Sequence, residues 1–130
     1  MGEREEEMVD YKSLDVWQKA RMIVKEIYAI SETFPPEEKY GLTSQIRRAA
    51  VSVPSNIAEG YNRHSSKDFV HFLRIAKGSA AETETQLILA KDVSLVTDEK
   101  AEPLLVEIDK LIRMISSLIL ARLKQMEGNR

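Results

Sequence analysis

The chain has 130 residues and no cysteine, so disulfides and thiolate metal ligands are excluded. This length suits a single domain with a genuine hydrophobic core. The net charge of −2 and the sequence pI of about 5.8 lie well below the strongly basic balance that would by itself mark a nucleic-acid-binding protein. The first ten residues are acidic and no apolar run approaches the ~20 residues of a membrane span, so we expect a cytoplasmic protein with no membrane partner.

Charge is distributed unevenly along the chain. Residues 1–10 contain four Glu, one Asp and one Arg, which predicts a disordered acidic leader ahead of a folded body at 11–126 and a disordered tail at 127–130. Between residues 42 and 77 there are six basic residues but only two acidic ones. This locally basic region supplies the candidate nucleic-acid contacts, which are Arg47, Arg48, Arg63, Lys67, Arg74 and Lys77.

The first expected helix covers residues 14–33. Apolar side chains recur there at helical spacing, at Val16, Ala20, Ile23, Ile27 and Ile30. The Phe34-Pro35-Pro36 sequence ends it, because a residue that precedes proline is pushed out of the α region.

The second expected helix covers residues 43–59 and contains Pro54. A proline in a helix interior removes one backbone hydrogen bond and crowds the carbonyl four residues earlier, so the sequence predicts a kink at Pro54 near the Ala50 carbonyl. Gly60 is expected to close the helix from the C′ position with a left-handed backbone.

The third expected helix begins at a capping box formed by Ser65 and Asp68. Two heptad series follow and predict a buried seam suited to near-parallel helix packing; they are Phe69, Ala76, Thr83 and Ala90, and Leu73, Ala80 and Leu87. Gly78 lies within a run of small residues. Since glycine costs ~1 kcal/mol against alanine inside a helix, we expect a close helix approach or a subunit contact there.

The fourth expected helix follows a cap at Thr97, with Pro103 near its start, and runs to about residue 126. Its apolar arc is broader than one coiled-coil seam, so Ile112 and Ile119 become candidates for oligomer contacts or close helix packing. Four helices joined by short loops predict an all-α, antiparallel up-down four-helix bundle with a kinked second helix. The surplus apolar surface favours assembly into a homo-oligomer.

Three segments together resemble a known family: LDVWQKA, LTSQIRRAAVSVPSNIAEG and DFVHFLRIAKGSAAETETQL. Over residues 11–124 the chain resembles the four-helix-bundle proteins encoded by intervening sequences of bacterial large-subunit ribosomal RNA genes. That family is similar in fold to the accessory proteins of diversity-generating retroelements, which form pentameric barrels and bind nucleic acid and a reverse transcriptase. The resemblance implies a homopentameric ring, RNA or DNA as a partner, and a polymerase-type partner protein.

Each candidate also has a simpler interpretation. The cations can be ordinary solvated side chains, and Arg47 or Arg48 can pair with Glu59 or Glu82. A di-iron bundle needs paired Glu-x-x-His motifs, whereas this chain has a single Asp68-x-x-His71, so we expect neither a metal, a cofactor nor catalysis. Two functions stay open: a nucleic-acid accessory protein, or a protein-binding scaffold with no nucleic-acid contact.

Overall fold

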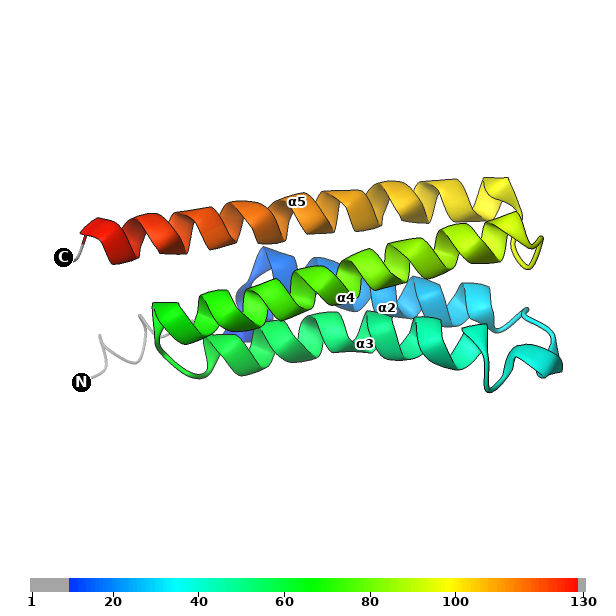
Figure 1. Cartoon of the computed structure of the whole chain (residues 1–130), viewed down its shortest axis with the longest axis horizontal. Coiled ribbons are helices and arrows are strands. Elements are labelled where there is room, and N and C mark those ends of the chain that lie inside the picture. The colour runs from blue at the N-terminus through cyan, green and yellow to red at the C-terminus, as the bar shows by residue number, and fades with distance from the viewer. Residues whose placement is uncertain (1–9, 129–130) are drawn as a thin grey trace.

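The computed structural model describes residues 10–128, and over that range the chain contains helices and no strand (Figure 1). Four long helices form the body of the molecule: α2 (Asp15–Ser31), α3 (Leu42–Tyr61), α4 (Ser66–Asp92) and α5 (Asp98–Gly128). Two short 3-10 turns accompany them, η1 (Tyr11–Ser13) before α2 and η2 (Pro36–Glu38) before α3. The all-α prediction with four helices is therefore confirmed for the described residues.

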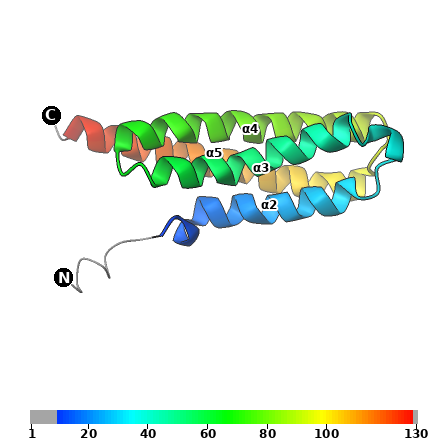
Figure 2. The same ribbon diagram turned by 90° about the horizontal axis from the view of Figure 1, so that it is seen from below.

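The four helices lie side by side around one core. Helix α3 packs against α2 and α4, and α5 packs against α4 and α2, while the two diagonal pairs make no close backbone approach in the described chain. Figures 1 and 2 both show the connections at the two ends of the rods, so each helix starts at the end where the previous one stops. The most extensive packing joins α3 to α4 and the least extensive of the four joins α2 to α5.

The core follows the expected apolar periodicities. Both heptad series of α4 are buried, from Phe69 to Ala90, and so are Val16, Ala20, Ile23 and Ile27 of α2. Burial of these apolar stripes holds the helices in place, because isolated helices are only marginally stable in water. The helix caps agree as well, since Ser65 Oγ accepts from Asp68 N at 3.3 Å and Thr97 Oγ1 accepts from Lys100 N at 3.3 Å.

The prediction for Gly60 is wrong. Helix α3 continues through it to Tyr61, and the described part of the chain contains no glycine with positive φ. The positive φ in this connection belongs to His64, at 56°. A Cβ at Gly60 would lie 2.5 Å from Cβ of Phe72, so glycine is required here by the close approach of α4 and not by helix termination.

Both helix-interior prolines lie in uninterrupted helices. Pro54 sits within α3, and Asn56 Nδ2 donates to the Ser52 carbonyl at 2.8 Å beside it. The bend that we expect at Pro54 stays a prediction. Pro103 follows a first turn that begins at Asp98.

The ends of the folded body differ slightly from expectation. Asp10, assigned to the leader, caps η1 by accepting from Lys12 N at 3.0 Å, and Glu127 and Gly128, assigned to the tail, belong to α5. Residues 1–9 and 129–130 lie outside the described residues, so the predicted disorder there stays a prediction.

The expected close approach at Gly78 is absent among residues 10–128. A Cβ at Gly78 would meet no heavy atom within 4 Å in the described structure, and the residue is exposed. Ile119 is buried and Ile112 is partly buried against the core, so both contribute to helix packing inside the bundle. A subunit contact at Gly78 stays a prediction.

Candidate nucleic-acid interface

The six candidate cations divide into two that form ion pairs within the described chain and four that do not. Arg47 belongs to the first group. It lies on the second turn of α3, where the 100° step between residues directs it toward the C-terminal end of α2, while Arg48 faces away from α2. Only 27% of the Arg47 side chain is exposed, whereas Arg48 is an exposed residue.

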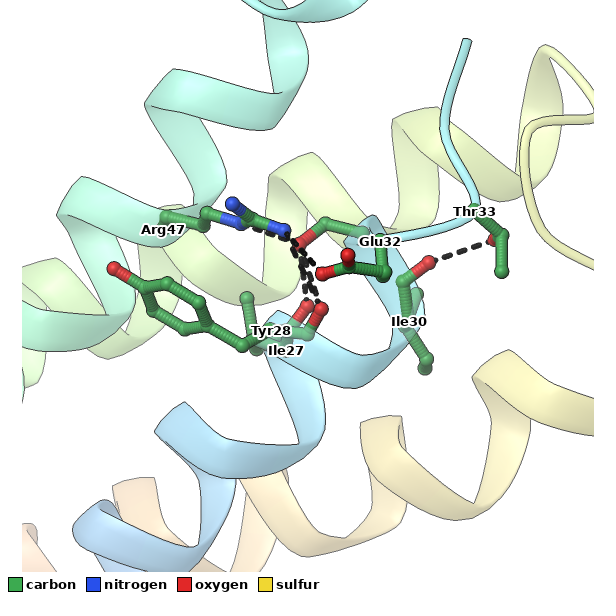
Figure 3. A network of polar contacts seen from close by, with 7 residues as sticks. Ile27, Tyr28, Ile30, Glu32, Thr33 and Arg47 are labelled. Atoms are coloured by element: carbon green, nitrogen blue, oxygen red, sulfur yellow. Dashed lines mark hydrogen bonds and ion pairs between the residues drawn. The ribbon is translucent and has the colours of Figure 1, made fainter.

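Arg47 joins α3 to the last turn of α2 (Figure 3). Its Nε donates to Oγ of the buried Ser31 at 2.8 Å, and its Nη2 donates to the Tyr28 carbonyl at 3.4 Å. Ser31 Oγ in turn donates to the Ile27 carbonyl at 2.7 Å. The Tyr28 carbonyl also accepts from Glu32 N at 3.0 Å, so the Arg47 contacts add a side-chain link between the two helices to a helix end that is already closed by its own backbone.

Two further contacts hold the Arg47 guanidinium in place. It lies over the Tyr28 ring, 4.5 Å from the centroid, and Nη2 is 3.6 Å from Oε2 of Glu32. The structural role weighed for Arg47 is therefore present, with Glu32 as its acidic partner in place of Glu59 or Glu82. A guanidinium whose Nε, Nη2 and one face are engaged is poorly available for a phosphate, and we remove Arg47 from the candidate interface.

Arg63 is also engaged. Its Nη2 is 3.1 Å from Oε2 of Glu59 one helical turn earlier, and its guanidinium lies 5.1 Å from the centroid of the Phe72 ring. About half of each charged side chain is exposed, so this pair contributes little to stability. It does neutralise the positive charge locally.

The other four candidates, Arg48, Lys67, Arg74 and Lys77, are exposed and form no ion pair with another described residue. Three of them lie along α4, and Arg48 lies on α3, the helix that packs most extensively against α4. We call these four residues of α3 and α4 the basic face; exposed cations without an ion pair in the described chain also lie on α2, at Lys25, and on α5, at Lys100 and Lys124.

Cations elsewhere in the bundle divide between paired and unpaired ones, and those without an ion pair in the described chain are Arg21, Lys25, Lys39, Lys100, Arg122 and Lys124. Lys19 of α2 is 2.6 Å from Oε1 of Glu107 on α5, and this hydrogen bond, with a second one from Lys110, lowers the pKa of Glu107. Lys91 of α4 is 2.7 Å from Oε1 of Glu102, and that hydrogen bond raises the pKa of Lys91.

Two grooves border the basic face. A groove of about 630 Å³ between α4 and α5 is mainly apolar, with Arg74 and Lys77 beside Gly78, Ile119 and Leu120. A second groove, of about 360 Å³, lies between α3 and α4 and is mainly polar. Its lining includes Arg48 together with Tyr40 and Gln86, two residues that sequence analysis did not select.

The sequence indicates only weakly that Tyr40 and Gln86 line this groove. Tyr40 is an aromatic residue in a charged connection, and 88% of it is exposed. Gln86 precedes the buried Leu87, but nothing in the local pattern says which groups it faces. Both become recognisable only when the connection before α3 and the middle of α4 are placed against the same groove.

Other kinds of site find no support in the described chain. No three His, Asp or Glu side chains among residues 10–128 gather closely enough to hold a metal ion. None of the helices in that range combines the length and the apolar run that a membrane span requires.

Comparisons with known proteins agree with this architecture. Residues 12–117 match the family described as "23S rRNA-intervening sequence protein". The crystal structure of a protein with unknown function from the S23 ribosomal protein family, from Bacteroides thetaiotaomicron VPI-5482, is 26% identical, with a TM-score of 0.74 over 80% of this chain and 97% of that chain. The curated proteins gave no match. Because the family match covers all four long helices except the end of α5, the chain belongs to the 23S rRNA-intervening sequence protein family.

Proposed function

We propose that this protein is a non-enzymatic nucleic-acid accessory protein that acts as a homo-oligomeric ring of antiparallel four-helix bundles. The observation that carries the proposal is the basic face, where four exposed cations have no acidic partner in the described chain. Arg47 and Arg63, by contrast, are each paired with a glutamate. Unpaired Lys and Arg side chains on two neighbouring helices attract phosphates through counterion release. Membership in a family named for intervening sequences of 23S rRNA supports RNA as the first nucleic acid to test.

Apolar exposure supports self-association. Leu120 is 60% exposed and Val106 is 52% exposed on α5, and Leu89 is 49% exposed on α4. A ring buries such residues without leaving an open edge, and a homopentamer is the assembly that we propose. Several copies of a modest basic face would then act together, since later contacts on one nucleic acid are effectively intramolecular.

The function is tested by charge reversal on the basic face. The variant Lys67→Glu with Arg74→Glu should abolish binding of a labelled RNA at low salt, because it replaces two phosphate contacts per subunit with repulsion. Lys77 is left unchanged so that the variant, like its control, reverses two charges.

The matched control is Lys25→Glu with Lys100→Glu, which changes the net charge equally but lies on α2 and the start of α5. This control should retain most of the binding. Equal losses in both variants would mean that net charge alone matters and that the basic face is not the site. Light scattering on each variant checks the oligomer, and a mass near 15 kDa for the unmodified protein would contradict the ring.

A second function, a protein-binding scaffold, is favoured by one observation, the apolar α4/α5 groove. A partner held there would bind through buried apolar surface, so its affinity would change little between low and high salt. A phosphate-dominated partner would instead lose affinity steeply.

A further inference from the structure

Charge is unevenly distributed along the pair of helices α4 and α5. Helix α5 packs against α4 and starts at the end where α4 stops, so residues 66–78 and 114–128 occupy the same half of the bundle (Figure 1). These two stretches contain five basic and two acidic residues, a net charge of +3. Residues 79–113, which form the other half of the pair, contain four basic and eight acidic residues, a net charge of −4. The pair is therefore positive at one end and negative at the other.

The cations of the positive half are also unpaired. None of the five forms an ion pair with another described residue. They define what we call the positive end, and they are Lys67, Arg74, Lys77, Arg122 and Lys124. In the negative half, by contrast, Lys91, Lys110 and Arg113 are each paired with a carboxylate. The uncompensated positive charge of α4 and α5 is thus concentrated in one half of the bundle.

An acidic stretch of the chain is attached in this same half. Residues 1–9 lie outside the described residues, and their sequence contains four glutamates and one arginine, a net side-chain charge of −3. They precede Asp10, which caps η1, and η1 packs against α2 and α3. Figures 1 and 2 both place η1 and the start of α2 in the half of the bundle where α3 ends and α4 begins. The acidic stretch therefore joins the fold on the side of the positive end.

The positive end is within reach of these glutamates. An extended residue spans at most ~3.3–3.6 Å, so Glu3, seven residues before Asp10, can lie up to ~24 Å from it. Neighbouring helices in a bundle are ~8–10 Å apart, so this length extends past α3 to the first turns of α4. A tethered segment has an effective concentration of roughly mM, so ion pairs that are individually weak can still form.

We propose that residues 1–9 bind the positive end of their own chain and compete there with nucleic-acid phosphates. This inference rests on the proposed function and names its regulation. Three of the four residues of the basic face, Lys67, Arg74 and Lys77, belong to the positive end. A glutamate carboxylate and a phosphate are both anionic acceptors for the same Lys and Arg donors, so the two exclude each other. The segment thereby lowers the affinity for RNA without contacting the RNA.

The first test measures binding of a labelled all-uridine octamer by fluorescence anisotropy at low salt. One variant combines Glu3→Gln, Glu5→Gln and Glu6→Gln. It should bind roughly fivefold more tightly than the unmodified protein, the factor that about 1 kcal/mol produces.

The matched control combines substitutions at three exposed carboxylates that form no ion pair among residues 10–128: Glu26→Gln, Glu37→Gln and Glu99→Gln. It removes the same charge from the opposite half of the bundle. Because salt screens charges that lie far from the RNA, the control should change the affinity by less than about twofold.

The second test detects the contact itself, in the full chain without RNA. Carbodiimide treatment joins a carboxylate to a lysine amine where the two touch, and mass spectrometry should find residues 1–9 linked to Lys67, Lys77 or Lys124. Lys39 and Lys100, exposed lysines at the opposite end, should not be linked to residues 1–9. Addition of the octamer should lower the yield of the links to the positive end.

The outcomes separate this inference from the proposed function. Equal gains in the two triple variants, or no gain in the first while the octamer still binds, overturn the inference and leave the proposed function standing. Absence of octamer binding by all three proteins overturns both. Absence of links to the positive end, or equally frequent links to Lys39 and Lys100, overturns the contact. Links that join an isotope-labelled chain to an unlabelled one, in a mixed assembly, would overturn the same-chain assignment and give the segment to a neighbouring copy.

Discussion

Arg47 and Arg48 are neighbours in sequence but belong to regions with different chemistry. At the α2/α3 corner, Arg47 donates to Ser31 and Tyr28, stacks on the Tyr28 ring and approaches Glu32. In the α3/α4 groove, Arg48 lies beside hydroxyls and an unpaired amide oxygen, with no ion pair to another described residue. The first region uses its cation to hold the fold together, and the second leaves its cation available.

The difference shows how to interpret basic residues in a bundle of this kind. A cation whose polar and aromatic neighbours already satisfy it contributes to stability, and its removal leaves buried groups without partners. A cation without such neighbours costs little to remove and is a candidate for binding. The predictions below test this distinction, beginning with the variant that should change the free energy of unfolding most.

Arg47→Ala should lower the free energy of unfolding by about 2–3 kcal/mol, because it removes charge-assisted hydrogen bonds and a cation–π contact. Urea denaturation followed by circular dichroism measures this loss. Arg47→Met keeps most of the apolar stem and removes every donor, so it should lose nearly as much. If Arg47→Met proved as stable as the unmodified protein, the corner would owe its stability to packing alone.

Gly60→Ala should destabilise the bundle by about 1–3 kcal/mol, because its Cβ would lie 2.5 Å from Cβ of Phe72 and 3.2 Å from Cδ1 of Phe69. This close approach joins α3 to α4 beyond the groove that contains Arg48. Gly78→Ala is the matched control: its Cβ meets no neighbour, so the better helix propensity should stabilise the helix by up to about 1 kcal/mol. Thermal unfolding of both variants shows whether each substitution raises or lowers the stability. Destabilisation by Gly78→Ala would place a subunit contact at Gly78.

Arg48→Ala should change the free energy of unfolding by less than about 0.5 kcal/mol, as surface substitutions usually do. Its effect should appear in RNA binding, where the slope of log affinity against log salt should fall by roughly 0.7 for each phosphate that the variant no longer binds. Anisotropy titrations at several salt concentrations measure that slope. A stability loss comparable to that of Arg47→Ala would remove the distinction between the two regions.

The smallest effect concerns Lys19, another engaged cation, whose ion pair with Glu107 joins α2 to α5. The pKa of Glu107 is lowered from its ordinary value of 4.5, so its contribution to stability is present above about that pH and is lost as the pH falls through the lowered value. The free energy of unfolding of Glu107→Gln should therefore be lower than that of the unmodified protein near pH 7. The two values should converge in acid. Glu26→Gln, at an exposed α2 carboxylate with no ion pair among residues 10–128, should show no such convergence.

Much of the fold followed from local pattern. The heptads of α4 predicted its buried seam, and Ser65 and Thr97 predicted two helix starts, because apolar periodicity and capping act over one or two turns. Gly60 was misassigned for the same reason. A glycine before a polar connection is typical of a helix end, and only the position of Phe72 on the next helix shows why glycine is needed.

The sequence by itself determined a helical domain, its four long elements and a central region rich in basic residues. Only the tertiary structure decided which of those residues are free, because pairing depends on contacts between segments far apart in the chain. Arg47 meets Ser31 sixteen positions earlier, and Arg48 shares a groove with Gln86. Local periodicity places a side chain on a helix face, and the packing of the neighbouring helix then decides whether that side chain stabilises the fold or stays available for a ligand.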